Sequence, residues 1–191
     1  MSNQNLRDIF EQVLQHPAIA LDSLPPLDLY MDQVLTLINQ PGIAEGEKGL
    51  TKSMINNYSK EGLIDPVKGK KYNTDQLLQI FLICVMKPSL SMNHIKIVMN
   101  ALREEEAPWP ELYQHYLNIK NEKSAGLASI FEQTMPTTKD LSITESSLLV
   151  LLLCTTAAHI TQIAERIVKE ELPPLIDQKK KESVSIKGTP S

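Results

Sequence analysis

Cysteine and glycine are scarce in this chain, which has two cysteines and seven glycines among its 191 residues. Cys84 and Cys154 both lie inside strongly apolar runs, so we interpret each as a small core residue, and no feature supports a disulfide. The twelve prolines stand mostly between apolar runs. A low glycine content, together with prolines that stand between the apolar runs, favours helices that are joined by proline-marked loops.

The chain also lacks the patterns that mark export, membrane insertion and common kinds of catalysis. Residues 1–7 contain no basic region followed by an apolar core, and no window has eighteen consecutive apolar residues, so we expect a reduced, cytoplasmic protein without membrane contact. A glycine-rich phosphate loop, a Gly-x-Ser-x-Gly elbow and paired carboxylates in an apolar setting are missing, so we expect no enzyme activity. The four histidines have no ligand partner at helical spacing, so we expect no metal or other cofactor.

Apolar residues recur at helical spacing along nearly the whole chain, and strand signals are almost absent, which predicts an all-α fold. A helix stripe starts near Leu6, and Asp28 is the expected cap of a second helix. The run 103–106 followed by Pro108-Trp109-Pro110 predicts a domain boundary. The expected parts are an amino-terminal helix and linker (1–27), a helix-turn-helix domain (28–106), a helical domain (107–175) and a disordered tail (176–191).

A short polar helix with a lysine-rich turn is the most informative stretch. Between residues 48 and 71 there are six lysines and two acidic residues, a local balance of +4 in a chain of formal net charge −4. Met54, Ile55 and Tyr58 mark the inward face of a helix over residues 51–60. The opposite face carries the polar side chains Lys52, Ser53, Asn56, Asn57 and Lys60. Asparagine can pair with adenine in the major groove and lysine can neutralise phosphates, so this stretch predicts DNA binding.

Residues 51–102 resemble the DNA-binding domain of MerR-type transcriptional regulators. The resemblance rests on the run Met-Ile-Asn-Asn-Tyr-Ser-Lys-Glu-Gly-Leu-Ile-Asp-Pro (54–66), on Lys-Lys-Tyr (70–72) and on Ser-Leu-Ser (89–91). It implies a winged helix-turn-helix fold in which Tyr58 contacts a phosphate and Lys70 stands near the wing arginine of that family. The implied DNA-binding residues are Lys52, Ser53, Asn56, Asn57, Tyr58, Lys60, Lys68, Lys70, Lys71 and Tyr72.

The same motifs also resemble an uncharacterised bacterial family that is typified by Met-Ile-Asn-Asn-Tyr and Lys-Lys-Tyr. In place of the Arg-Tyr-Tyr of MerR proteins this chain has Asn56-Asn57-Tyr58. Each of these residues also has a plain structural interpretation. The two asparagines can be solvated surface, the lysines of 68–71 can solubilise a turn, and the rings of Tyr58 and Tyr72 can pack in the core with the hydroxyl at its edge.

The capping-box pattern of Ser142 and Glu145 predicts the start of a long helix that reaches about residue 171. Residues 148–153 are apolar on every face, so this helix must be surrounded by its own chain or by a second copy. Farther along, Ile160, Ile163 and Ile167 form a coiled-coil-like seam. Burial inside the helical domain and dimerisation through this seam both fit the pattern.

These observations predict a sequence-specific transcriptional regulator that binds double-stranded DNA as a homodimer, because two reading helices match a palindromic site. The alternative is a helical adaptor that has kept the fold and binds a protein partner without enzyme activity. Residues 1–47 carry one basic and seven acidic side chains, which favours the adaptor if they lie beside the lysines.

Overall fold

The computed structural model describes residues 3–14, 18–40, 49–134 and 140–187, which are mostly helical, as the all-α prediction required. Its elements are α1 (Asn3–Leu14), the 3-10 turn η1 (Leu21–Ser23), β1 (Leu29–Tyr30), α2 (Met31–Ile38), α3 (Lys52–Lys60), β2 (Lys71–Tyr72), α4 (Thr74–Met86), α5 (Met92–Glu104), α6 (Trp109–Thr134), α7 (Ile143–Arg166), the π-helical η2 (Ile167–Glu171) and α8 (Leu172–Lys187).

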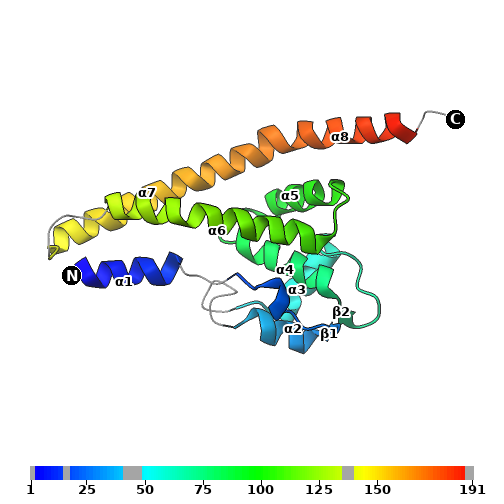
Figure 1. Cartoon of the computed structure of the whole chain (residues 1–191), viewed down its shortest axis with the longest axis horizontal. Helices are drawn as coiled ribbons and strands as arrows, with labels where there is room; N and C mark the ends of the chain where they lie inside the picture. Colours follow the sequence, from blue (N-terminus) through cyan, green and yellow to red (C-terminus); the bar gives the residue numbers. More distant parts are fainter. Residues whose placement is uncertain (1–2, 15–17, 41–48, 135–139, 188–191) are drawn as a thin grey trace.

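The main core forms around α4, which is apolar on nearly every face. Asn73 caps this helix: its side chain accepts a hydrogen bond from the Gln76 amide (3.0 Å), and the Gln76 side chain accepts one from the Asn73 amide (2.9 Å). The side chains from Gln76 to Cys84 are buried. Helices α5 and α6 pack against α4, and β2 packs beside its beginning (Figure 1).

The first turns of α6 belong to this same core, which corrects the domain boundary expected at 106/107. Trp109, Tyr113 and Leu117 are buried in the cluster that contains α4. The Tyr113 hydroxyl donates a hydrogen bond to the carbonyl of Ile19 (3.0 Å), so α6 also ties the segment before β1 to the core. The prolines at 108 and 110 therefore mark the start of a helix, where a missing amide costs little, and not a linker.

Two short strands complete the main core, although strand signals are almost absent from the sequence. β1 and β2 pair antiparallel, with Leu29 opposite Tyr72 and Tyr30 opposite Lys71. Strands of two residues are too short to show an alternating pattern. Because β1 occupies residues 29 and 30, α2 begins after the expected cap at Asp28. The cap is Tyr30, whose amide donates to the Gln33 side chain (2.9 Å).

The last quarter of the described chain is one long helix, in which α8 follows α7 through η2 without a break (Figure 1). The sequence predicted an end near Glu171 because Pro173 and Pro174 lack amide donors. Only Leu172 separates the π-helical turn Ile167–Glu171 from these prolines, and such turns occur where the regular series of backbone hydrogen bonds is interrupted. The expectation of disorder over 176–191 is therefore wrong for residues 176–187, and the remaining four lie outside the described residues.

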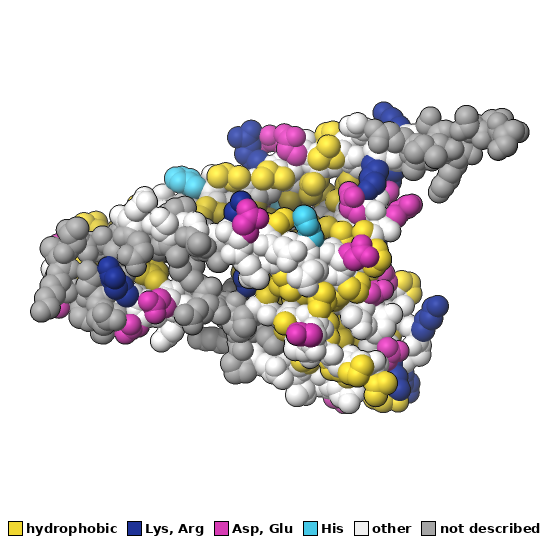
Figure 2. Space-filling view, in the orientation of Figure 1, with side chains coloured by type: hydrophobic (Ala, Val, Ile, Leu, Met, Phe, Trp, Pro, Cys, Tyr) yellow, Lys and Arg dark blue, Asp and Glu magenta, His cyan; other side chains and the backbone are white. Residues whose placement is uncertain are grey.

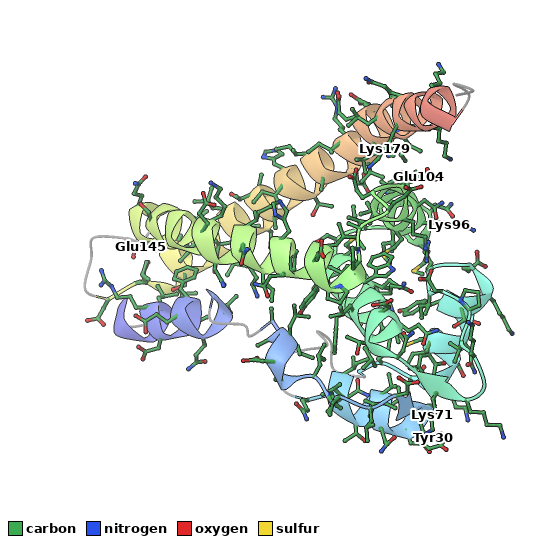
Figure 3. The ribbon with its side chains drawn as sticks, turned by 45° about the vertical axis from the view of Figure 1, so that its right-hand side comes forward. Tyr30, Lys71, Lys96, Glu104, Glu145 and Lys179 are labelled. Atoms are coloured by element: carbon green, nitrogen blue, oxygen red, sulfur yellow. The ribbon has the colours of Figure 1, made fainter. Side chains whose placement is uncertain are left out.

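Contacts with α5 hold this long helix on the main core. Val168 of η2 is buried, and the Lys179 and Lys180 ammonium groups lie 2.7 and 3.2 Å from the carboxylates of Glu105 and Glu104. Figure 3 labels Lys179 and Glu104, one residue from each pair. At the other end, Leu149 and Leu153 of α7 pack with Leu6 of α1 and with Leu141. These two groups of contacts anchor both ends of α7.

Most of α7 between these anchors is exposed, so the core of its own chain does not surround it. Cys154 is exposed as well, which corrects its interpretation as a core residue, because it lies on this uncovered part of the helix. Cys84 is buried in α4 as expected, and burial raises the pKa of its thiol to about 11.

Candidate nucleic-acid interface

Helix α3 presents one polar face and one buried face, because its apolar residues recur at helical spacing. The Thr51 hydroxyl accepts a hydrogen bond from the Met54 amide (3.3 Å) and caps the helix. Ile55 and Tyr58 are buried and Met54 is half-buried. All five predicted polar side chains are exposed on the opposite face: Lys52, Ser53, Asn56, Asn57 and Lys60.

The end of α3 is fixed by a left-handed glycine. Gly62 has a φ of +72°, a conformation that side-chain-bearing residues rarely adopt. The Leu63 amide donates to the Tyr58 carbonyl (2.9 Å) and the Gly62 amide donates to the Ser59 carbonyl (3.1 Å), which is the Schellman arrangement. Leu63 and Ile64 then turn back into the core, so the chain leaves α3 in a defined direction.

Asp65 is the centre of a polar network that connects this exit to α4 and α5. Its carboxylate accepts hydrogen bonds from Arg103 Nε (3.0 Å) and from Gln79 Nε2 (2.6 Å). Arg103 Nη2 also donates to the carbonyl of Leu63 (2.8 Å), and the Asp65 amide donates to the Gln79 side chain (2.7 Å). The wing, defined here as residues 67–72, therefore starts from a backbone that two helices hold.

Gln76 and Gln79 are the buried polar side chains of the described core. Gln76 Nε2 donates to the carbonyls of Asp65 (3.3 Å) and Pro66 (3.0 Å). Buried amides of this kind stabilise a fold only when their partners are present, so the network specifies the position of the wing root. Helical periodicity alone did not reveal this role, because glutamines inside an apolar run have no local partner in the sequence.

The wing carries three exposed lysines, Lys68, Lys70 and Lys71, around a left-handed Gly69 (φ +73°). The Lys71 ammonium lies 5.0 Å from the centre of the Tyr30 ring, which joins the wing to β1 (Figure 3). Both α3 and β2 pack against α2. The structure thus places α3, with its polar face, and the wing beside one helix, α2.

Acidic side chains lie beside the wing as well. A cavity of about 220 Å³ lies at its base and is lined by acidic, basic and uncharged residues. The acidic ones are Asp28, Asp65 and Asp75, the basic ones are Lys68 and Lys71, and the uncharged ones are Pro66, Asn73 and Gln76. Burial, with a smaller contribution from Asp65, raises the pKa of Asp75 above its usual range. The positive field of the wing is therefore partly offset on the side that faces α2 and α4.

The two tyrosines of the predicted set point inward. Burial raises the pKa of Tyr72, whose side chain is 5% exposed. The Tyr58 hydroxyl is buried and has no hydrogen-bond partner among the described residues, so it does not reach the surface as expected for a phosphate contact. This corrects the expectation for Tyr58, since its ring fills the space between α3 and the core.

Lys87 is a cation beside α3 that the sequence did not reveal. Its ammonium lies 3.9 Å from the sulfur of Met54 and 5.8 Å from the centre of the Tyr58 ring. It follows the last turn of the apolar α4 in the sequence, far from the lysine-rich stretch. By contrast, Lys96 of α5 pairs with Glu61 (3.8 Å), and both side chains are largely exposed.

The predicted dimerisation residues lie on a different part of the molecule. Ile160, Ile163 and Ile167 are exposed on the long helix, apart from α3 and the wing (Figure 1). The structure thus separates the predicted residues into one set on the main core and one set on α7. Among the described residues, no group of three His, Cys, Asp or Glu side chains is arranged to hold a metal ion.

Comparison with known families identifies the main core. The model of a family described as "Domain of unknown function (DUF1836)" matches residues 19–116. The chain belongs to the DUF1836 family. The matched DUF1836 region begins at the buried Ile19 and ends within the part of α6 that joins the main core, so it coincides with that core. The resemblance to an uncharacterised domain family is thereby confirmed.

No curated protein and no solved structure matches the chain. Within DUF1836 the match includes α3, the wing root and Arg103. It leaves out α7 and α8, so the exposed isoleucines belong to a part of this protein outside the family region.

Proposed function

We propose that this DUF1836 protein binds double-stranded DNA with sequence specificity through α3 and the wing, as a MerR-like winged helix-turn-helix domain. The observation that carries the proposal is the exposed polar face of α3 next to a wing whose root is held by Asp65, Arg103 and Gln79. A rigid helix with an uninterrupted polar face is the element that enters a major groove.

The chemistry of this face divides into two roles. Asn56 and Asn57 are adjacent and exposed, and an asparagine amide can give a bidentate pair with the N6 and N7 positions of adenine. Lys52 and Lys60 lie at the two ends of the same helix, where they would meet phosphates on either side of the groove. Lys87 adds a further charge beside α3.

The wing supplies the remaining phosphate contacts in this proposal. Lys68, Lys70 and Lys71 project from a turn that is close to β1, so their backbone is positioned before DNA arrives. The acidic groups Asp28 and Asp75 lie near the same turn. They would repel misplaced phosphates and restrict the side from which DNA approaches.

The acidic groups also favour a second candidate, an adaptor that binds a protein partner. A long connection joins α2 to α3, from Asn39 to Thr51, whereas a standard helix-turn-helix has a turn of about three or four residues. If DNA does not bind, this departure and the mixed charge at the wing make a protein partner the next candidate.

Selection from a random pool of DNA duplexes tests the proposal. The wild type should enrich one motif, and an Asn56→Ala/Asn57→Ala variant should lose that enrichment. The matched control is Asn93→Ala/Asn118→Ala, which removes two exposed asparagines from α5 and α6. Enrichment that survives the α3 change would contradict base reading by these asparagines, and no enrichment from any protein would favour the adaptor.

The salt dependence of binding tests the wing. A Lys70→Gln/Lys71→Gln variant should bind DNA more weakly and should reduce the slope of log K against log salt by about 2, since each phosphate contact contributes about 0.9. Lys123→Gln/Lys169→Gln is the control of equal charge on α6 and η2. A wing variant with the slope of the wild type would show that these lysines do not contact phosphates.

A further inference from the structure

Helix α7 and the turn after it expose a row of large apolar side chains that no part of the described chain covers. We call these residues the α7 stripe: Leu148 (58% exposed), Leu152 (51%), Ile160 (58%), Ile163 (60%) and Ile167 (49%). They are separated by three, four or eight positions, so they lie on one face of the helix. Figure 2 shows hydrophobic side chains in a row along this helix.

The part of the α7 stripe from Leu148 to Ile163 lies in a long uncharged run, whereas Ile167 follows Glu165 and Arg166. Residues 146–164 include no Asp, Glu, Lys or Arg. Contiguous apolar surface of this kind is rare on a monomeric soluble protein and marks a contact with another apolar surface. A nucleic acid or a strongly charged peptide therefore does not fit this face.

The anchors of α7 hold the stripe in place. Leu149 and Leu153 pack with Leu6 of α1, and Val168 is buried where η2 meets α5. Leu153, Ile160 and Ile167 follow one another at intervals of seven positions, so they lie along the same side of the helix. The same seam is thus covered by α1 at its beginning and open farther along.

We propose that a second copy of this chain covers the α7 stripe and forms a two-fold homodimer by pairing of α7 with its equivalent. From Leu148 to Ile163 this apolar face carries no charge and is complementary to itself, because neither copy brings a repulsive group to that part of the contact. A two-fold contact uses the same patch on both copies, and closed symmetric dimers are the commonest soluble oligomers. The spacing of Ile160, Ile163 and Ile167 is that of the seam between paired helices.

A lipid bilayer is the other apolar surface that the composition of this helix allows. The helix over Ile143–Lys181 contains a window with a mean hydropathy of 1.7, long and apolar enough to cross a membrane, and none of that window is buried. Its neighbours oppose this. Helix α1 lies against Leu149 and Leu153 and carries the exposed charges Arg7, Asp8 and Glu11, which insertion would take into hydrocarbon.

Polar residues on α7 also fit a protein contact better than a bilayer. His159 and Gln162 lie in the second half of the uncharged region, and both are exposed. Beyond Ala164 the helix continues into Glu165 and Arg166 and then docks on α5. The stripe therefore belongs to the same helix that packs on the main core, and its side chains are exposed in the single chain.

Sedimentation equilibrium of the full chain without DNA tests this proposal. The wild type should sediment with twice the monomer mass of 21.4 kDa. An Ile160→Lys/Ile163→Lys variant should sediment as a monomer with an unchanged circular dichroism spectrum, because both side chains are exposed in the single chain. The matched control is Val85→Lys/Ile119→Lys, whose side chains are 49% and 46% exposed on α4 and α6 and which should remain dimeric.

Three results would overturn the proposal. A wild type that is monomeric at every loading concentration would remove the dimer, and a stripe variant that stays dimeric would place the contact elsewhere. In a flotation assay with phosphatidylcholine vesicles, a wild type that floats while the stripe variant does not would make the bilayer the occupant. Because no DNA is present, failure here leaves the proposed DNA binding untouched, and the DNA selection can fail without affecting this result.

Discussion

Gly49 and Asn39 close the loop between α2 and α3 at its two ends. Asn39 Nδ2 donates to the Leu50 carbonyl (2.9 Å), and the Leu50 amide donates to Asn39 Oδ1 (2.6 Å). Gly49 has a φ of +56°, and a Cβ at this position would lie 2.7 Å from Asn39 Oδ1. The position of α3 relative to α2 therefore depends on one residue without a side chain.

We expect Gly49→Ala to lower the free energy of unfolding by about 3–4 kcal/mol, from left-handed strain of about 1–2 kcal/mol and two disturbed Asn39 hydrogen bonds of about 1 kcal/mol each. Gly69→Ala is the control, because Gly69 has a φ of +73° and no atom within 4 Å of the added Cβ. Urea denaturation measures both.

The collision itself can be isolated with Asn39→Ala. In that background the added methyl of Gly49→Ala meets no amide oxygen, so its cost should fall toward that of Gly69→Ala. If Gly49→Ala lowers the free energy of unfolding by the same amount with and without the Asn39 side chain, this account is contradicted.

The exposure of individual side chains follows from the sequence where a single helix decides it. The exposed face of α3 follows from Met54, Ile55 and Tyr58, because helical geometry fixes which neighbours point outward. The sequence does not reveal the contacts of Arg103 and Gln79. Their partner Asp65 is 38 and 14 positions away, and such contacts exist only in the folded chain. The same limit explains Lys87, which comes near α3 only through the packing of α4.

At the scale of elements, the joint between α3, the wing and α5 depends on the guanidinium of Arg103. It contacts the Asp65 carboxylate and the Leu63 carbonyl, and it lies 5.9 Å from the centre of the Trp109 ring. One side chain thus joins the wing root to α5 and to the beginning of α6.

We expect Arg103→Met to lower the free energy of unfolding by about 1–3 kcal/mol, because it removes hydrogen bonds to a charged group and to a carbonyl in a partly buried setting. Lys96→Met is the control, since it removes an exposed pair with Glu61 worth about 0–1 kcal/mol. Guanidinium denaturation gives the difference. Equal losses for the two variants would show that the Asp65 network does not stabilise the wing root.

The helices that were predicted correctly and the one that was not differ in their source of stability. Local signals, such as the caps at Thr51 and Asn73, locate α3 and α4. The continuation of the last helix through Pro173 and Pro174 has no local signal. The continuation depends on the docking of α8 against α5 through Lys179 and Lys180. The sequence around the prolines contains no sign of this docking.

For the whole molecule, the structure combines a DUF1836 core over residues 19–116 with a long helix that extends beyond it. The proposed reading face lies on the core and the α7 stripe lies on the helix. Each copy of a two-fold dimer would therefore carry its own reading helix, and the relative position of the two copies would be set by α7.

Dimerisation through α7 and DNA binding through α3 would together determine the DNA site that the protein selects. A wild-type dimer should select a palindromic DNA site whose halves are a whole number of helical turns apart, about 10 base pairs each. The Ile160→Lys/Ile163→Lys variant should bind each half-site separately. Its binding curve on the full site should lose cooperativity, and its affinity for an isolated half-site should equal that of the wild type. Titration of full and half sites in a gel-shift assay separates these outcomes. If the variant binds the full site as tightly as the wild type does, α7 does not set the spacing of the two reading helices.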